Sequence, residues 1–292
     1  MKIAMLGFGE AARAIVAGWR ESLETPPPLS AFDIKHDAGG EARAGIVRAC
    51  ADLRVRCAPT VADGLAEAGA VFSLVTADRA LEAAESAAVA IGPGTLYLDG
   101  NSCAPSTKQA AAGLIEAAGG RYVDMAIMAP IHPARHRTPV LLAGEAAGEA
   151  QALLAGLDMR PTLAGNRVGQ ASAIKMLRSV MIKGLEALTA ECLLAARRAG
   201  VEEAVLASLQ ASDPGFDWKA RGAYNLERMM VHGARRAAEM TEVAVTLRDL
   251  GVPDRMTQAA AQWQRQIAGL ALAPGDAALD ARADRILNRL AP

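Results

Sequence analysis

The chain has 292 residues, of which 52% are hydrophobic and 22% are charged, and its net charge is −1. This length is enough for a large core and for about two domains. The balance of 31 basic against 32 acidic residues and an aromatic content of only 3% argue against a nucleic-acid partner and against a membrane-surface partner.

Short apolar runs alternate with alanine-rich helical stretches in the first half of the chain. This alternation predicts a mostly parallel sheet with helices on both faces, as in a Rossmann-like α/β domain. The expected strands cover residues 2–6, 29–34, 70–76, 95–99, 121–124 and 139–143. The expected helices cover residues 11–23, 40–50, 61–68, 80–90 and 106–118.

The pattern changes near Gly165, after which the chain has little strand character. The expected helices of this second half cover residues 169–199, 202–211, 218–250 and 255–270. We therefore predict a dinucleotide-binding domain at 1–165 and an all-α domain at 166–292. The first helix of the second half would be a long interdomain helix. A helix of that length is typical of a dimer core, so we expect a homodimer through the helical domain and a substrate site that the helical domain helps to form.

Cysteine usage and hydropathy exclude further classes. The four cysteines form no CxxC pair and lie far from any histidine cluster, so we expect neither a metal site nor a disulfide framework. No apolar run approaches the ~18 residues that a membrane helix needs. The first apolar run is also too short for a secretory signal. We expect a cytoplasmic protein.

The N-terminal strand leads into Gly7-Phe8-Gly9-Glu10-Ala11-Ala12 and then into a helix. This is a GxGxxA pattern in the strand–turn–helix context that dinucleotide binding requires. Gly7 would permit the tight turn, Gly9 would let the backbone approach a pyrophosphate, and Ala12 would keep helix and strand close. The alternative is a tight turn that binds no ligand.

Asp33 follows the second predicted strand and can accept hydrogen bonds from ribose hydroxyls. Its charge would repel a 2′-phosphate, which favours NAD over NADP. Lys35 and His36 come next and are able to hold such a phosphate, although both also fit a solvated turn.

Two further segments end predicted strands and should lie at the carboxyl edge of the sheet. Val75 and Thr76 end one strand and are expected beside the nicotinamide or its ribose. Asn101 and Ser102 follow another strand and are expected at the mouth of the same crevice.

Four segments occur in a distinctive order: the glycine loop at 7–12, D-G-N-S-C-A-P at 99–105, V-D-M-A-I-M-A-P at 123–130 and G-Q-A-S-A-I-K at 169–175. This order resembles the β-hydroxyacid dehydrogenase superfamily, which includes 3-hydroxyisobutyrate, tartronate semialdehyde and 6-phosphogluconate dehydrogenases. The resemblance implies that Lys175 is the catalytic lysine. An ammonium group there can donate a proton to the reacting carbonyl and stabilise a developing alkoxide. A lysine on a helix taken alone would more simply be a surface residue.

The segment Met128-Ala129-Pro130 and the residue Ser179 depart from the pattern of that superfamily. Met128-Ala129-Pro130 replaces the S-G-G segment that holds the substrate carboxylate, and it supplies neither the hydroxyl nor the full set of N–H donors. Ser179 stands where the superfamily usually has asparagine. With these changes the chain resembles a branch of the superfamily whose C-terminal helical domain has no assigned function. The reaction class carries over to this chain, whereas a simple 3-hydroxy-acid substrate does not.

Two basic clusters are candidates for holding a small-molecule substrate. The loop from His132 to Arg137 is rich in histidine and arginine, which bind carboxylates and phosphates, but it also fits a solvated basic loop. A later helix carries His232, Arg236 and Glu239 on one face. That face equally fits salt bridges between helices or between subunits.

The leading hypothesis is an NAD(P)-dependent dehydrogenase or reductase that moves hydride between the nicotinamide and an alcohol/carbonyl pair, with Lys175 as general acid and base. One alternative is an imine reductase, but such relatives usually lack the lysine. Another is a dinucleotide-binding sensor or scaffold dimer without catalytic activity, which the altered Met128–Pro130 segment would suit.

Overall fold

The computed structural model describes residues 1–290, which divide into two compact units. The first unit comprises Met1–Met176 and the second begins at Leu177. The division falls within one long helix, α7 (Gln170–Arg198), and lies C-terminal to residue 165, where the sequence placed the domain boundary.

Within the described residues, the first unit contains one eight-stranded sheet in the order β3-β2-β1-β4-β5-β6-β7-β8. The strands from β3 to β6 in that order are parallel, β7 is antiparallel to β6, and β8 is parallel to β7. Because β1 lies between β2 and β4, the winding of the sheet reverses beside β1, and ligands of such sheets bind beyond the carboxyl ends of the strands at that point. The strands are β1 (Lys2–Leu6), β2 (Leu29–Phe32), β3 (Arg56–Cys57), β4 (Ala68–Ser73), β5 (Leu96–Asp99), β6 (Arg121–Ile127), β7 (Pro139–Ala143) and β8 (Arg160–Gly165).

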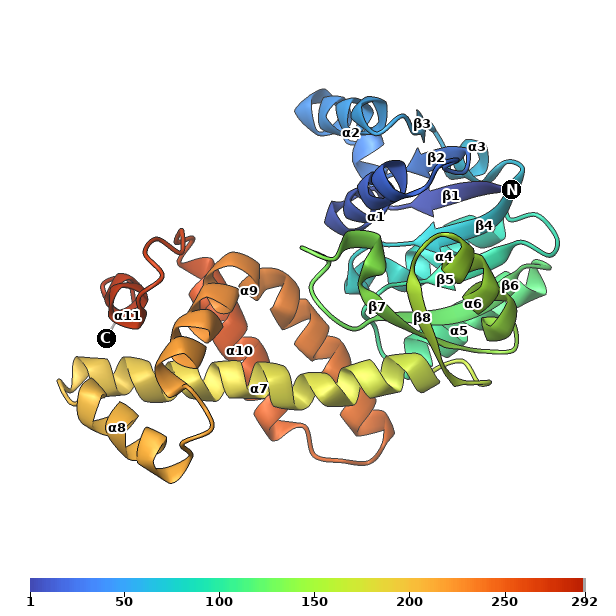
Figure 1. The fold of residues 1–292 in the computed structure, drawn as a ribbon. Helices are drawn as coiled ribbons and strands as arrows, with labels where there is room; N and C mark the ends of the chain where they lie inside the picture. The colour runs from blue at the N-terminus through green and yellow to red at the C-terminus, as the bar shows by residue number, and fades with distance from the viewer. Residues whose placement is uncertain (291–292) are drawn as a thin grey trace. The chain divides into compact units, whose positions relative to one another are not determined.

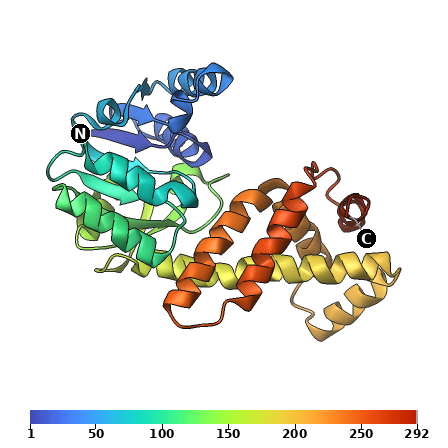
Figure 2. The same cartoon turned by 180° about the vertical axis from the view of Figure 1, so that it is seen from behind.

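Helices cover both faces of this sheet, as Figures 1 and 2 show from opposite sides. One apolar core joins the sheet to α1 (Glu10–Ser22), α2 (Gly40–Asp52) and α6 (Ala147–Gly156). A second core joins the other face to α3 (Val61–Leu65), α4 (Ala80–Ala88) and α5 (Pro105–Ala117). The first unit is therefore a three-layer α/β/α domain.

Helix α1 illustrates why these segments fold as they do. Its buried residues Ala12, Ile15, Val16 and Trp19 recur at the helical period and form one face against the sheet. Trp19 is fully buried and meets the ring of Phe72 on β4 edge to face, with centroids 5.5 Å apart. Burial of each large side chain contributes about 1.5–3 kcal/mol. This packing fixes the start of α1, and hence the loop before it.

The second unit is helical throughout its described residues. Its helices are the main part of α7, then α8 (Glu202–Ser212), α9 (Trp218–Asp249), α10 (Arg255–Gly269) and α11 (Leu279–Leu287). Their core includes Leu193 on α7, Leu226 on α9, Ile267 on α10 and Ile286 on α11. None of the described helices is both long and apolar enough to span a bilayer.

The predicted class, a Rossmann-like α/β domain followed by an all-α domain entered by a long helix, is confirmed. Two predicted strands extend too far. The strand expected to reach residue 76 ends at Ser73, because the N–H of Val75 donates to the side chain of Asn101 and not to a neighbouring strand. The strand expected to reach residue 34 ends at Phe32, because Asp33 starts a turn by accepting from the N–H of Lys35.

Among the strands and α-helices of the described residues, β3, β8, α6 and α11 were not expected from the sequence. Strand β3 has two residues, and β8 contains Pro161 and is exposed or half-buried along its length, so neither gives a clear hydrophobic period.

Candidate active site

The glycine loop lies between β1 and α1, at the carboxyl edge of the sheet. Gly7 has φ +88°, and a Cβ there would lie 2.6 Å from the carbonyl oxygen of Leu74 on the next segment, so only glycine fits. A Cβ at Gly9, the N-cap residue of α1, would have no protein atom within 4 Å. No side chain caps this helix start. Its first-turn N–H groups therefore offer the donors and positive dipole end that bind phosphate.

The residue between the two glycines is held on both sides. The N–H of Phe8 donates to Asp33 Oδ2 over 2.8 Å, and Arg13 Nε donates to the carbonyl of Phe8 over 2.8 Å. The Phe8 ring is buried. The backbone of the glycine loop is thus held in place by Asp33 and Arg13. Because the Phe8 ring is buried, Phe8 can contribute to a ligand site only through its backbone.

Asp33 and Lys35 lie beyond the end of β2, beside that loop. Asp33 is only 9% exposed and uses one carboxylate oxygen for Phe8 and the other for the N–H of Lys35, at 2.9 Å. The Lys35 side chain is exposed. Both residues lie at the edge where the sequence placed them, and Asp33 also supports the glycine loop.

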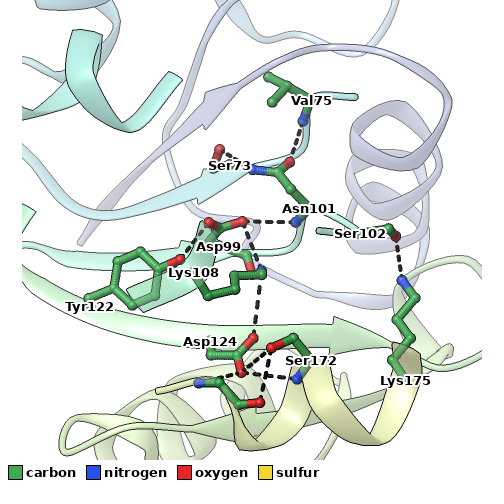
Figure 3. A network of polar contacts seen from close by, with 11 residues as sticks. Ser73, Val75, Asp99, Asn101, Ser102, Lys108, Tyr122, Asp124, Ser172 and Lys175 are labelled. Atoms are coloured by element: carbon green, nitrogen blue, oxygen red, sulfur yellow. Dashed lines mark hydrogen bonds and ion pairs between the residues drawn. The ribbon is translucent and has the colours of Figure 1, made fainter. Parts of the chain in front are cut away.

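Asn101 joins the loops that follow β4 and β5. Its Oδ1 accepts from the N–H of Val75 over 2.6 Å, and its Nδ2 donates to Ser73 Oγ over 2.9 Å (Figure 3). The side chain is 3% exposed. The structure therefore brings Asn101 and Val75 together at the carboxyl edge of the sheet, and the amide of Asn101 links the segments that follow β4 and β5. Thr76 is exposed and precedes the short 3-10 helix η2 (Ala77–Arg79).

Ser102 and Lys175 meet although they are far apart in sequence. Lys175 Nζ donates a hydrogen bond to Ser102 Oγ over 2.6 Å (Figure 3). Both side chains are half-buried and lie within the first unit. An ammonium group beside a hydroxyl, at the carboxyl edge of a parallel sheet, is an arrangement that can pass a proton to a third oxygen.

Near this pair lies a fully buried ion-pair cluster that was not predicted from the sequence. It consists of Asp99 at the end of β5, Lys108 on α5 and Asp124 on β6. Lys108 Nζ lies 3.0 Å from Asp99 Oδ1 and 3.6 Å from Asp124 Oδ1. Burial alone would lower the pKa of Lys108, but the two carboxylates raise it above its usual value, so the ammonium stays charged. Lys108 shares the apolar face of α5 with Ala111, Ala112 and Ile115, and a lysine on such a face signals a buried carboxylate partner.

The segment after β6 carries the Met128 position. The N–H of Met128 donates to the carbonyl of Pro139, and its side chain packs in a small apolar cluster with Ala171 of α7. Met128 therefore packs against a cluster that includes Ala171, which lies about one helical turn before Lys175 on α7.

The basic loop at 132–137 has partners inside the first unit. Arg135 forms a bidentate pair with Glu21 on α1 at 2.6 and 2.7 Å, and Arg137 Nε donates to Asp158 over 2.9 Å. Hydrogen bonds from Arg137 and then His136 lower the pKa of Asp158 to about 2. His132 is exposed. The loop thus uses its arginines and His136 to dock onto neighbouring elements, and only His132 remains a substrate candidate there.

Comparison with known proteins finds similar structures that cover nearly the whole chain. A conserved hypothetical protein from Sinorhizobium meliloti 1021 is 37% identical, with a TM-score of 0.76 over 99% of this chain and 97% of that chain. The conserved protein MTH1747, described as structurally similar to 3-hydroxyacid dehydrogenases, is 27% identical, with a TM-score of 0.70 over 94% of this chain and all of that one. The chain belongs to the β-hydroxyacid dehydrogenase superfamily.

Two further similarities concern the fold and the helical unit. A 3-hydroxyisobutyrate dehydrogenase from Mycobacterium tuberculosis, solved with L-serine, shares the fold, with a TM-score of 0.73 over 97% of this chain and 98% of that one at 15% identity. A domain of unknown function (DUF1932) matches residues 196–267, in the helical unit. This β-hydroxyacid dehydrogenase superfamily member therefore belongs to the branch whose C-terminal domain has no assigned role.

The helical unit of this superfamily member holds the other sequence candidates. Arg236 Nε donates to Glu186 over 2.9 Å, and its Nη2 contacts the other oxygen of the same carboxylate. Both residues are buried. This is the interhelical salt bridge that the sequence left as the alternative to substrate contact. Ser179 accepts from Lys183 over 3.0 Å, and His232 is half-buried on α9.

Proposed function

We propose that this protein is an NAD(P)-dependent oxidoreductase that moves hydride between the nicotinamide and an alcohol/carbonyl pair of a small-molecule substrate. The observation that carries the proposal is the 2.6 Å hydrogen bond between Lys175 and Ser102. It lies at the sheet edge that also carries the glycine loop and the start of α1, which no side chain caps. Cofactor and proton donor would then act at one edge of one parallel sheet.

The glycine loop fits a dinucleotide. The pyrophosphate would lie on the uncapped start of α1, where the space in front of Gly9 is open and the first-turn N–H groups of Glu10, Ala11 and Ala12 are the expected donors. The carboxylate of Asp33 would accept the ribose hydroxyls, which favours NAD. Val75 and Thr76 follow β4, next to Gly7, and would border the nicotinamide side. When bound, the nicotinamide supplies or accepts the hydride.

Lys175 would act as the general acid and base. In the reducing direction its ammonium donates a proton to the carbonyl oxygen, and in the oxidising direction the neutral amine takes the hydroxyl proton. Ser102 holds the lysine side chain in place and can offer its own hydroxyl to the same substrate oxygen. The partly buried position of Lys175 strengthens the electrostatic stabilisation that its ammonium group would give to an alkoxide.

The substrate class is an alcohol or its carbonyl partner whose recognition differs from that of simple 3-hydroxy acids. Met128 is half-buried where the superfamily has small polar residues, so the wall near Lys175 is more apolar. We keep Ser102, Met128 and His132 as substrate candidates in the α/β unit. Ser179 and His232 remain candidates in the helical unit, whereas the ion pair of Arg236 with Glu186 favours a structural role for Arg236.

We also propose that the protein is a homodimer through the exposed face of α7. Leu177, Met181, Leu185 and Leu188 follow one another at helical spacing and are 36–62% exposed. Arg178 and Glu191 are exposed near the two ends of this row. In an antiparallel pairing of two copies, each Arg178 would face Glu191 of the other copy. Light scattering should give a dimeric mass for the wild type and a monomeric mass for Met181→Glu; a monomeric wild type would contradict the dimer.

The cofactor site is tested by binding of NADH and NADPH, followed through nicotinamide fluorescence. Gly9→Ala should keep the thermal stability, because the added Cβ meets no protein atom, but it should weaken NADH binding by about tenfold or more by blocking the pyrophosphate. Gly148→Ala on α6 is the matched control, since a Cβ there also has open space and lies away from the site. Equal NADH affinity in the two variants would contradict the assigned loop.

Cofactor choice and substrate class are read in the same preparation. Asp33→Ala should weaken NADH more than NADPH, and an unchanged ratio would remove Asp33 from the proposal. A turnover screen against hydroxy acids, polyols and aryl-substituted alcohols should find at least one oxidised substrate. If turnover appeared only with a carbonyl supplied together with an amine, the imine reductase alternative would replace the dehydrogenase.

A further inference from the structure

Three charged side chains are buried side by side in the sheet and α5, beneath the edge that carries Ser102 and Lys175. Asp99 and Asp124 are register partners on the parallel strands β5 and β6, and Lys108 reaches both of them from α5. All three side chains have no solvent exposure. Lys108 Nζ also donates to the backbone carbonyl of Asp99 over 2.5 Å. One ammonium group thus serves two carboxylates, which leaves one negative charge for other donors to balance.

The first carboxylate holds the loop that carries Ser102. Asp99 Oδ1 accepts from the N–H of Asn101 over 2.9 Å, and Oδ2 accepts from the hydroxyl of Tyr122 over 2.5 Å (Figure 3). Asn101 in turn fixes the loop after β4. The residue next to Asn101 is Ser102, so Asp99 sets the direction in which the chain leaves β5 toward the site.

The second carboxylate holds the start of the helix that carries Lys175. Asp124 Oδ2 accepts from the N–H of Gly169 over 3.1 Å, from the N–H of Ser172 over 3.0 Å and from Ser172 Oγ over 3.1 Å. A negative charge is favourable at a helix N-terminus, where the N–H groups lack partners within the helix. Lys175 lies one turn beyond this anchor.

We propose that Asp99, Lys108 and Asp124 form a buried brace that sets the separation between Ser102 and Lys175, so that Lys108 and Asp124 are positioning residues for proton transfer. The brace anchors both the loop that carries Ser102 and the start of the helix that carries Lys175. The hydrogen bond between Lys175 and Ser102 connects these two segments at the site. The proposal rests on the proposed role of Lys175. Its chemical reason is that displacement of a reacting group by about 1 Å can slow a reaction about 10²-fold.

A purely structural purpose accounts poorly for this cluster. Replacing a buried ion-pair triad with apolar residues of similar volume is often neutral or stabilising, so the charges are not needed for packing. What apolar residues cannot do is accept the N–H groups of Asn101, Gly169 and Ser172. These three donors all belong to segments that lead to the proposed site. The raised pKa of Lys108 agrees with an ammonium that stays charged while it holds both carboxylates.

The test uses Asp124→Asn in the full chain. The asparagine retains one oxygen for the helix N–H groups but replaces the charge that faces Lys108 with a second donor. We expect kcat with a substrate from the screen to fall by about 10- to 100-fold, while the Kd for NADH stays unchanged. Ser172→Ala removes only one of the three helix contacts and should lower kcat by about fivefold, as expected for one hydrogen bond. Ile115→Ala on α5 is the control, because it disturbs a buried position of the same helix without touching the brace.

A second readout needs no substrate. Acetic anhydride labels lysine amines, and peptide mass spectrometry gives the labelling rate of Lys175 relative to the exposed Lys219. Loosening of the bond to Ser102 should raise this ratio by about fivefold in Asp124→Asn, and Ile115→Ala should leave it at the wild-type value. If Asp124→Asn does not fold, Ser172→Ala and Tyr122→Phe are read in the same way.

The outcomes separate the brace from the proposed function. Wild-type kcat together with wild-type Lys175 labelling in Asp124→Asn and Ser172→Ala would overturn the brace. Equal loss of kcat in Ile115→Ala would also overturn it, because the effect would then be general destabilisation. If the wild type turned over no substrate but Lys175 labelling rose as expected, the proposed function would fail and the brace would stand.

Discussion

Both units of this protein bury charged side chains, but the charges have different partners. In the α/β unit, Asp99 and Asp124 accept backbone N–H groups from segments that lead to Ser102 and Lys175. In the helical unit, Glu186 and Glu239 are paired with side chains on neighbouring turns and helices.

The difference teaches how a buried charge should be interpreted. Glu186 receives Arg236 from α9 and Gln264 from α10, so it holds α7, α9 and α10 together. Asp124 accepts the N–H groups of Gly169 and of Ser172 in the first turn of α7, so it positions a backbone segment. Glu186 accepts from side chains and fixes helix packing, whereas Asp99 and Asp124 also accept backbone N–H groups beside the sheet edge and fix loops. Only the second kind points to a site.

The largest expected effect comes from removing the cation of the α/β unit. Lys108→Met leaves Asp99 and Asp124 buried without a counter-charge, which should cost about 3–5 kcal/mol in the free energy of unfolding near neutral pH. The loss should shrink as the pH falls, because protonation of the carboxylates removes the uncompensated charge. Urea unfolding at several pH values measures this, with Lys219→Met as an exposed control. A loss that does not depend on pH would contradict the assigned ion pairs.

In the wild type the same lysine predicts the behaviour at high pH. Its pKa is raised in the folded state, so its contribution to stability is complete below the ordinary lysine pKa and disappears as the pH rises through the raised value. The free energy of unfolding of wild type and Lys108→Met should therefore converge at both ends of the pH range.

A smaller effect is expected from the buried pair of the helical unit once both charges are removed. Arg236→Met alone should cost about 3 kcal/mol, because it leaves Glu186 buried and unpaired. The double variant Arg236→Met, Glu186→Leu should recover to within about 1 kcal/mol of the wild type. NADH affinity should be unchanged in both. Weaker NADH binding in the double variant would contradict the conclusion that the buried charges of the helical unit fix helix packing and not the cofactor site.

Much of the α/β unit was predictable because local signals and global fold agree there. The order of apolar runs gave the parallel sheet, and the positive φ of Gly7 and the open space at Gly9 match the roles that the GxGxxA spacing predicts. The hydrogen bond between Ser102 and Lys175 was not predicted from the sequence, because a contact between residues so far apart leaves no local pattern.

The remaining site features depend on tertiary contacts. Lys108 gave a usable signal, a lysine on the apolar face of α5, but its two partners come from different strands. The basic loop looked like a ligand site because Glu21 and Asp158, which neutralise Arg135 and Arg137, are distant in sequence. Composition alone therefore overstates how many of its charges are available to a substrate.

The central claim is that Lys175 transfers the proton at the edge where the dinucleotide binds. The most direct measurement is turnover and NADH affinity of Lys175→Ala in one preparation. We predict that kcat falls by about 10²- to 10⁴-fold while the Kd for NADH stays at the wild-type value. Wild-type turnover in Lys175→Ala would contradict the account, and so would a loss of NADH binding large enough to explain the loss of turnover.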